Sequence, residues 1–172
     1  MRRVTGRVWN VVEMELVGVR VELPSDTPIA LLRERGGDRR VLPIFIGAPE
    51  ATAIAFALEE VQVPRPMTHD LLKNLLDDLG VSVESVVVTD LQEGTFYAEI
   101  ELHARDGVHR VSSRPSDAIA LAARTGTPIY AEETVLDQAA YAAPDDEPVE
   151  EEEVVEQFKD FIDSVNPEDF AS

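Results

Sequence analysis

Hydrophobic and polar positions alternate in the first part of the chain and then change to helical spacing. Side chains alternate from Met14 to Glu22 as a β-strand requires, because successive strand side chains point to opposite faces of a sheet. β-rich runs at 29–34 and 40–46 follow, with turn signals between the runs at Pro24-Ser25-Asp26 and Gly36-Gly37-Asp38. These residues predict a meander of three strands.

Two helices are predicted after the meander. The first begins near Pro49, and its residues 51–60 form one apolar face, made by Ala51, Ile54, Ala55 and Leu58. Pro64-Arg65-Pro66 then interrupts the chain. The second helix begins near Thr68, a candidate N-cap, and ends at Gly80, a residue type that suits a helix C-terminus.

The second half of the chain repeats this grouping of strands before helices. Strands are predicted at 81–90, 95–103 and 108–112, then a helix from Pro115 to Gly126, a short strand at 128–131 and a short helix at 132–138. The order βββαα followed by βββα predicts one α+β domain over residues 1–140, with antiparallel or mixed sheets and helices packed on them. The repeated order also suggests two similar βββα-type halves.

Composition changes abruptly after Ala140. Residues 141–153 are rich in proline, aspartate and glutamate and are predicted to be a flexible acidic linker. Residues 154–172 carry apolar side chains at helical spacing on an acidic background, and these are Val154, Phe158, Phe161, Ile162 and Val165. Two interpretations stay open for this amphipathic segment: it docks on its own domain, or it binds a partner, for which a basic protein is the natural candidate.

Charge and composition narrow the class of protein. The net charge is −19, and residues 141–172 account for −11 of it with twelve acidic residues against Lys159. The other 140 residues are also acidic, which argues against a protein that coats DNA non-specifically. The chain has no cysteine, and its three histidines do not form a paired metal motif. With neither a membrane span nor a secretory signal in view, we expect a cytoplasmic protein.

Two segments carry the best indication of chemistry. Arg65-Pro66-Met67-Thr68-His69-Asp70 and Arg114-Pro115-Ser116-Asp117 each place a guanidinium, a proline and a carboxylate at the start of a predicted helix. Free backbone N–H groups and the positive end of the helix dipole lie there too, so either segment could hold a phosphate or a metal that binds phosphate. Each carboxylate, and Glu50 at the start of the first helix, also suits a helix N-terminus without any ligand.

Four blocks of the sequence resemble the bifunctional nuclease domain family. They are Leu42-Pro43-Ile44-Phe45-Ile46-Gly47 with Glu50-Ala51, Arg65 to Leu71, Gly94-Thr95-Phe96-Tyr97-Ala98, and Arg114 to Ala122 with Pro128-Ile129. The resemblance covers roughly residues 14–138, and the segment from Phe158 to Phe170 resembles the C-terminus of actinobacterial members. The resemblance implies a nuclease whose substrates are RNA and DNA. It also implies a compact α+β domain that forms oligomers.

The residue types in these blocks suggest how phosphodiester hydrolysis could proceed. A divalent Mg²⁺ or Mn²⁺ is the expected activator in a chain without cysteine, with Glu50, Asp70 and Asp117 as candidate metal ligands. Arg65 and Arg114 could clamp phosphate oxygens. His69 is the candidate general base or acid, and Asp70 and Asp117 are counted with it as candidate catalytic residues. The pair Glu99 and Glu101 on one strand is a weaker alternative.

A non-catalytic alternative is an oligomeric interaction module whose acidic tail binds a basic partner. The charge balance favours this second interpretation, whereas the resemblance favours the nuclease. For either function we predict a homo-oligomer, most simply a dimer. Its proposed contact is the alanine-rich helix face within residues 51–57, which would be covered by a second copy.

Overall fold

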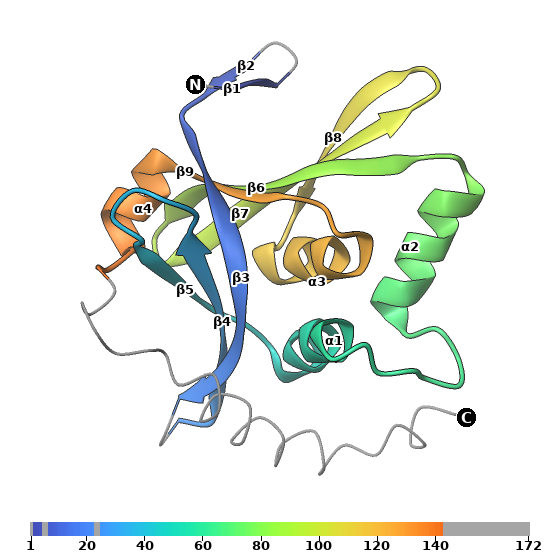
Figure 1. Ribbon diagram of the computed structural model, residues 1–172, viewed down its shortest axis with the longest axis horizontal. Coiled ribbons are helices and arrows are strands. Elements are labelled where there is room, and N and C mark those ends of the chain that lie inside the picture. The colour runs from blue at the N-terminus through green and yellow to red at the C-terminus, as the bar shows by residue number, and fades with distance from the viewer. Residues whose placement is uncertain (1, 5–6, 23–24, 143–172) are drawn as a thin grey trace.

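A seven-stranded mixed sheet organises the chain in the computed structural model, which describes residues 2–4, 7–22 and 25–142 (Figure 1). A separate two-stranded hairpin joins β1 (Arg2–Val4) to β2 (Arg7–Trp9). The strand order in the large sheet is β5 (Val41–Phe45), β4 (Thr27–Glu34), β3 (Val11–Glu22), β9 (Ile129–Glu132), β6 (Ser82–Gln92), β7 (Thr95–Ala104) and β8 (Gly107–Ser113).

The short strand β9 joins two antiparallel meanders into this one sheet. It pairs antiparallel with β3, where Ile129 lies opposite Met14, and parallel with β6, where Ile129 lies opposite Val86. All other neighbouring strands in the sheet are antiparallel. The α+β class predicted from the sequence is therefore confirmed, while the likeness of two halves stays a prediction.

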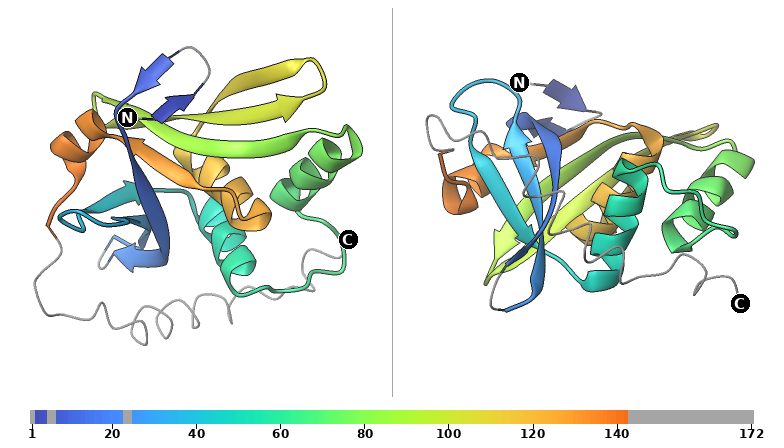
Figure 2. Two further views of the ribbon diagram at one scale, coloured as in Figure 1. Left: turned by 45° about the horizontal axis from the view of Figure 1, so that its top comes forward. Right: turned by 60° about the horizontal axis from the view of Figure 1, so that its bottom comes forward.

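The described part of the chain forms four helices, and three of them lie together (Figure 2). α1 (Ala48–Leu58) packs against α3 (Pro115–Thr125) and against β3 and β4, and α3 packs against β6 and β7. α2 (Thr68–Asp78) packs on α3 at one end of the molecule, and α4 (Glu133–Ala139) lies at the opposite end (Figure 1). The three predicted helix starts near residues 49, 68 and 115 are confirmed.

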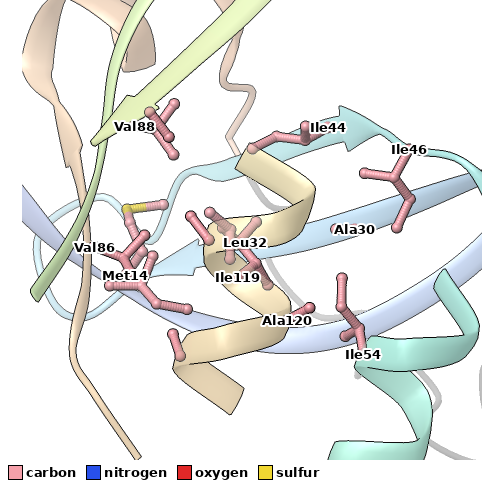
Figure 3. Close-up of a cluster of buried hydrophobic side chains, with 14 of the residues drawn as sticks. Met14, Ala30, Leu32, Ile44, Ile46, Ile54, Val86, Val88, Ile119 and Ala120 are labelled. Carbon is pink, nitrogen blue, oxygen red and sulfur yellow. The ribbon is translucent and has the colours of Figure 1, made fainter. Parts of the chain in front are cut away.

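The hydrophobic core lies between the sheet and the helices α1 and α3. Figure 3 shows part of this core, in which Ile119 of α3 lies close to Leu32 of β4 and Ile54 of α1 lies beside Ala120 of α3. Met14 of β3 and Val86 of β6 belong to the same cluster. Full burial of each such aliphatic side chain stabilises the fold by roughly 1.5–3 kcal/mol. The alternation of apolar side chains along the strands therefore has a direct cause, because one face of the sheet packs on two helices.

Burial of α1 changes two expectations from the sequence. Every residue from Ala51 to Phe56 is buried within the chain, whereas Leu58 of the predicted apolar face is 45% exposed. The helix is buried around most of its circumference because it lies between α3 and the sheet. The alanine-rich face is thus already covered without a second copy, so this helix no longer supports the predicted dimer. Oligomerisation itself stays a prediction.

The end of the described chain is fixed to the sheet. Tyr141 exchanges two backbone hydrogen bonds with Val41, at 2.8 and 3.0 Å. The predicted linker and amphipathic segment lie outside the described residues from 143 onward, so the division of the chain stays a prediction. Within the described ranges, no helix has the length and apolar character needed to cross a membrane.

Candidate functional site

The two Arg-Pro segments begin α2 and α3, as their sequence predicts, and Glu50 lies in the first turn of α1. Arg114 is the N-cap of α3. The N-cap of α2 is Met67 and not Thr68, because the Asp70 carboxylate accepts a hydrogen bond from the backbone N–H of Met67 at 2.9 Å. An acidic residue in the first turn satisfies a backbone donor that the helix itself leaves free.

Arg114 draws side chains from three helix starts into one cluster. Its Nη2 donates to Glu50 Oε1 at 2.6 Å, and its Nε donates to Asp117 Oδ2 at 2.7 Å. Asp117 Oδ1 lies 3.1 Å from Nη2 of the same guanidinium and 3.0 Å from Nε2 of His69. We call Glu50, His69, Arg114 and Asp117 the Arg114 cluster. α1, α2 and α3 each supply at least one of its members.

The electrostatics of the cluster keep its arginine and its aspartate charged. Burial raises the pKa of Asp117, but hydrogen bonds from Arg114 and from His69 outweigh burial, so this pKa lies below its ordinary value. The carboxylates of Asp117 and Glu50 raise the pKa of Arg114 further above its ordinary value. The Arg114 side chain is 67% exposed, whereas that of Glu50 is only 14% exposed. A permanent positive charge therefore lies at the surface over two partly buried carboxylates.

A second ion pair fixes α2 to the other two helices. Arg124 Nε donates to Asp70 Oδ1, and Arg124 Nη1 donates to the carbonyl oxygens of Ala53 at 2.9 Å and Ala120 at 3.0 Å. The Arg124 side chain is only 7% exposed. Arg124 is absent from the residues predicted from the sequence. Its only signal is the seven-residue spacing from Asp117, which places both side chains on one face of α3.

The predicted metal ligands do not meet at one point. Glu50 and Asp117 both bind Arg114, whereas Asp70 binds Arg124 and the Met67 backbone. Across the described residues, no three His, Cys, Asp or Glu side chains are arranged to hold a metal ion. The carboxylates as arranged do not surround one divalent cation, because Arg114 holds Glu50 and Asp117, whereas Arg124 and the Met67 backbone hold Asp70. Dependence on Mg²⁺ or Mn²⁺ stays a prediction.

The remaining candidates lie outside the Arg114 cluster. Arg65 is exposed, and no ion pair to it occurs among the residues that the structure describes. Glu101 pairs with Arg110 at 3.3 Å on the neighbouring strand, and Glu99 lies opposite Ser112. The strand carboxylates are therefore part of a sheet surface with its own cation partner.

The Arg114 cluster contains a group that can accept a proton and a nearby cation that can bind an anion. When His69 Nε2 donates its proton to Asp117, the second ring nitrogen Nδ1 is a proton acceptor. Asp117 then orients the imidazole and stabilises its protonated form, as a carboxylate does beside a catalytic histidine. Arg114 has one further group, Nη1, without a hydrogen bond to any described residue. This group can donate to an oxyanion.

Comparisons with a family model and with related proteins point to the same family. The bifunctional nuclease domain matches residues 30–144. An uncharacterized protein of Mycobacterium tuberculosis is 50% identical over 163 residues, which cover 92% of this chain and 97% of that protein. Bifunctional nuclease 1 of Arabidopsis thaliana is 30% identical over 105 residues, which cover 59% of this chain and 32% of the plant protein. Because the matched domain spans more than half of its length, this chain belongs to the bifunctional nuclease domain family.

Proposed function

We propose that this chain is a nuclease that hydrolyses phosphodiester bonds of RNA and DNA at the Arg114 cluster. The observation that carries the proposal is the contact of His69 with Asp117, at 3.0 Å, beside the exposed guanidinium of Arg114. The names of the plant relatives support a nuclease, although the chain matches only about a third of their length.

The proposed reaction assigns one task to each member of the cluster. Arg114 binds a phosphate oxygen through Nη1 and neutralises the charge that develops on the phosphorane. His69 accepts a proton from the attacking water at Nδ1, and the carboxylate of Asp117 stabilises the imidazolium that results. As the water oxygen bonds to phosphorus, the P–O bond to the departing sugar oxygen breaks. That oxygen takes a proton from solvent, and the imidazolium returns its proton to solvent. Glu50 holds the guanidinium in place from the α1 side through its 2.6 Å contact.

The test compares two histidines that each contact an aspartate. His69→Gln keeps a hydrogen-bond donor for Asp117 but loses the proton acceptor, so we expect cleavage of labelled RNA and DNA to fall by at least about 100-fold. His109→Gln is the matched control, because Nε2 of the exposed His109 on β8 lies 2.9 Å from Oδ1 of Asp106 in the preceding turn, and so forms the same kind of pair. Its activity should equal that of the unmodified protein.

The assay includes arms with EDTA, with Mg²⁺ and with Mn²⁺, and these read the predicted metal dependence separately from the role of His69. If the purified chain cleaves neither substrate under any of these conditions, the nuclease proposal is wrong. Equal activity of His69→Gln and His109→Gln would instead remove His69 from the mechanism.

A non-catalytic binding module is the second candidate, and the net charge of −19 favours it. An acidic surface repels nucleic acid and attracts basic proteins. The same cleavage assay separates the two functions, because a binding module would have no activity to lose.

A further inference from the structure

Helix α2 carries several leucines that the rest of the described chain leaves exposed. Both views in Figure 2 show α2 at one end of the molecule, where it packs on α3. His69 is the one buried residue of α2, and the partly buried Leu76 packs against the core. The remaining leucines of this helix and of its C-cap are between 37% and 71% exposed, and these are Leu71, Leu72, Leu75 and Leu79.

The spacing of these four leucines gathers them on one side of the helix. Leu71, Leu75 and Leu79 are four residues apart, so their side chains follow one another along the helix surface, and Leu72 adjoins them. We call these four residues the leucine stripe. Several large apolar side chains that meet on an exposed face indicate a surface that another chain or segment covers.

Opposite charges lie at the two ends of the leucine stripe. Arg65 precedes the start of α2, whereas Asp78 lies in its last turn, where the negative end of the helix dipole disfavours a carboxylate. Both side chains are exposed, and neither forms an ion pair with a residue that the structure describes. Because the helix between them is about 16 Å long, they cannot pair with each other within one chain.

A second copy of the chain matches both features of this surface. When two α2 helices lie antiparallel with Leu75 at the two-fold axis, Leu71 of each copy lies opposite Leu79 of the partner subunit. The same arrangement brings Arg65 of each copy to the end of the helix that carries Asp78 of the partner subunit. Such a contact is self-complementary, as a two-fold interface requires, and it also sets the two helix dipoles antiparallel.

The chain's own amphipathic segment, residues 154–165, suits the leucine stripe less well. This segment carries three acidic residues and one basic residue, and it directly follows four consecutive glutamates. Asp77 and Asp78 already lie at one end of the stripe. Like charges across a contact cost free energy, so charge favours the second copy over the acidic segment.

From the exposed leucines, their symmetric spacing and the unpaired charges we infer that α2 is a dimer interface, in which the leucine stripes of two copies pack antiparallel. One helix face is smaller than a standard interface of about 800 Å² per partner. The dimer should therefore form at micromolar concentrations and dissociate on dilution. This inference does not depend on the proposed nuclease function.

Sedimentation equilibrium of the full chain at a series of concentrations tests the interface. The average mass should rise from that of one chain towards that of two between about 1 µM and about 500 µM. Leu75→Gln puts a polar group at the two-fold axis and should raise the dissociation constant about tenfold or more. Thermal melting should show that this variant stays folded, because Leu75 is already half exposed.

Leu58→Gln is the matched control. Leu58 lies at the end of α1, outside the leucine stripe, and its exposed fraction of 45% is close to the 50% of Leu75. The same substitution there should leave the dissociation constant unchanged. Equal effects of the two substitutions would overturn α2 as the interface.

The antiparallel arrangement has a separate test in the two charges. Arg65→Glu and Asp78→Arg each place like charges together in both ends of the dimer, so each variant alone should dimerise about threefold or more weakly at low salt. An equal mixture of the two variants should dimerise as well as the unmodified chain, because every contact in the mixed dimer joins opposite charges. A mixture no better than either variant alone would overturn the antiparallel pairing.

Other occupants of the leucine stripe give different results. A full chain that stays monomeric over the whole concentration range would overturn the dimer. If residues 154–165 of the same chain cover the stripe, Phe158→Gln combined with Phe161→Gln should convert that monomer into a dimer, which would assign the stripe to the segment. A chain that is monomeric with and without these two substitutions would leave the stripe to another protein.

Discussion

Asp117 contacts both His69, the proposed general base, and Arg114, which is proposed to bind the phosphate. Its carboxylate lies against His69 and against Arg114, on a helix whose first turn would favour an acidic residue without any function. If Asp117 serves the reaction, removing its charge should lower activity. If Asp117 only complements the helix dipole, removing its charge should lower stability.

We expect Asp117→Asn to lower cleavage of RNA and DNA by at least about 100-fold, because the neutral amide no longer stabilises a protonated His69. Initial rates and thermal melting of the same sample check this expectation. A loss of about 1 kcal/mol in stability with full activity would assign Asp117 to the helix dipole alone.

The pH dependence of this residue has a defined sign. Because the pKa of Asp117 is lowered in the folded chain, its charge stabilises the fold above the ordinary pKa of an aspartate. That contribution is lost as the pH falls through the folded value. Chemical denaturation of the unmodified protein and of Asp117→Asn across this acidic range measures the loss, which should be absent from the variant.

Individual side chains were only partly predictable from the sequence. The residues at the helix starts could be found because Arg-Pro and a nearby acidic residue are local signals. Arg124 could not be assigned a partner, because its contacts with Asp70 and Ala53 depend on how α1, α2 and α3 cross. The contact of Glu50 with Arg114 likewise joins residues 64 positions apart.

At the scale of elements, an ion network fixes the short helix α4 to the edge of the sheet. Arg40 donates to Glu34 on β4 at 3.1 Å and to Glu133 on α4 at 2.8 Å. Its hydrogen bonds lower the pKa of Glu34, even though burial acts in the opposite direction. The network is partly buried, so its loss should affect stability more than loss of an exposed ion pair.

Glu34→Gln should therefore lower the free energy of unfolding by about 2 kcal/mol at pH 7. A carboxyl with a lowered pKa stabilises the fold above its ordinary value and loses that effect as the pH falls through the folded value. The difference between the variant and the unmodified protein should consequently shrink below about pH 4. Chemical denaturation at both pH values measures it, and a difference independent of pH would show that packing and not charge is responsible.

Elements were more predictable than their arrangement. Alternation and turn residues located the strands, because both are properties of neighbouring residues. The insertion of β9 between β3 and β6 could not be predicted, since strand order depends on pairing between distant segments. The burial of α1 on most sides could not be predicted either, because a run of alanines is equally compatible with an exposed apolar face and with a helix inside a core.

At the scale of the whole molecule, the distribution of charge conflicts with the proposed substrate. Residues 143–172 contain twelve acidic residues and one basic residue, Lys159, which gives this segment a net charge of −11. The negative charge of this segment repels nucleic acid that comes within about one Debye length of it, a distance of about 10 Å at 0.1 M salt. The segment should therefore weaken binding through charge alone.

Deletion of residues 143–172 tests this effect and keeps the Tyr141 pairing with Val41 intact. We expect higher affinity for a labelled oligonucleotide at low salt, with a gain that shrinks as salt screens the charges. Substitution of the four consecutive glutamates 150–153 by glutamine removes four charges from the full chain and should give part of the same gain. A gain that is independent of salt would point to steric covering of the site, and unchanged affinity at low salt would leave the acidic segment to a basic partner.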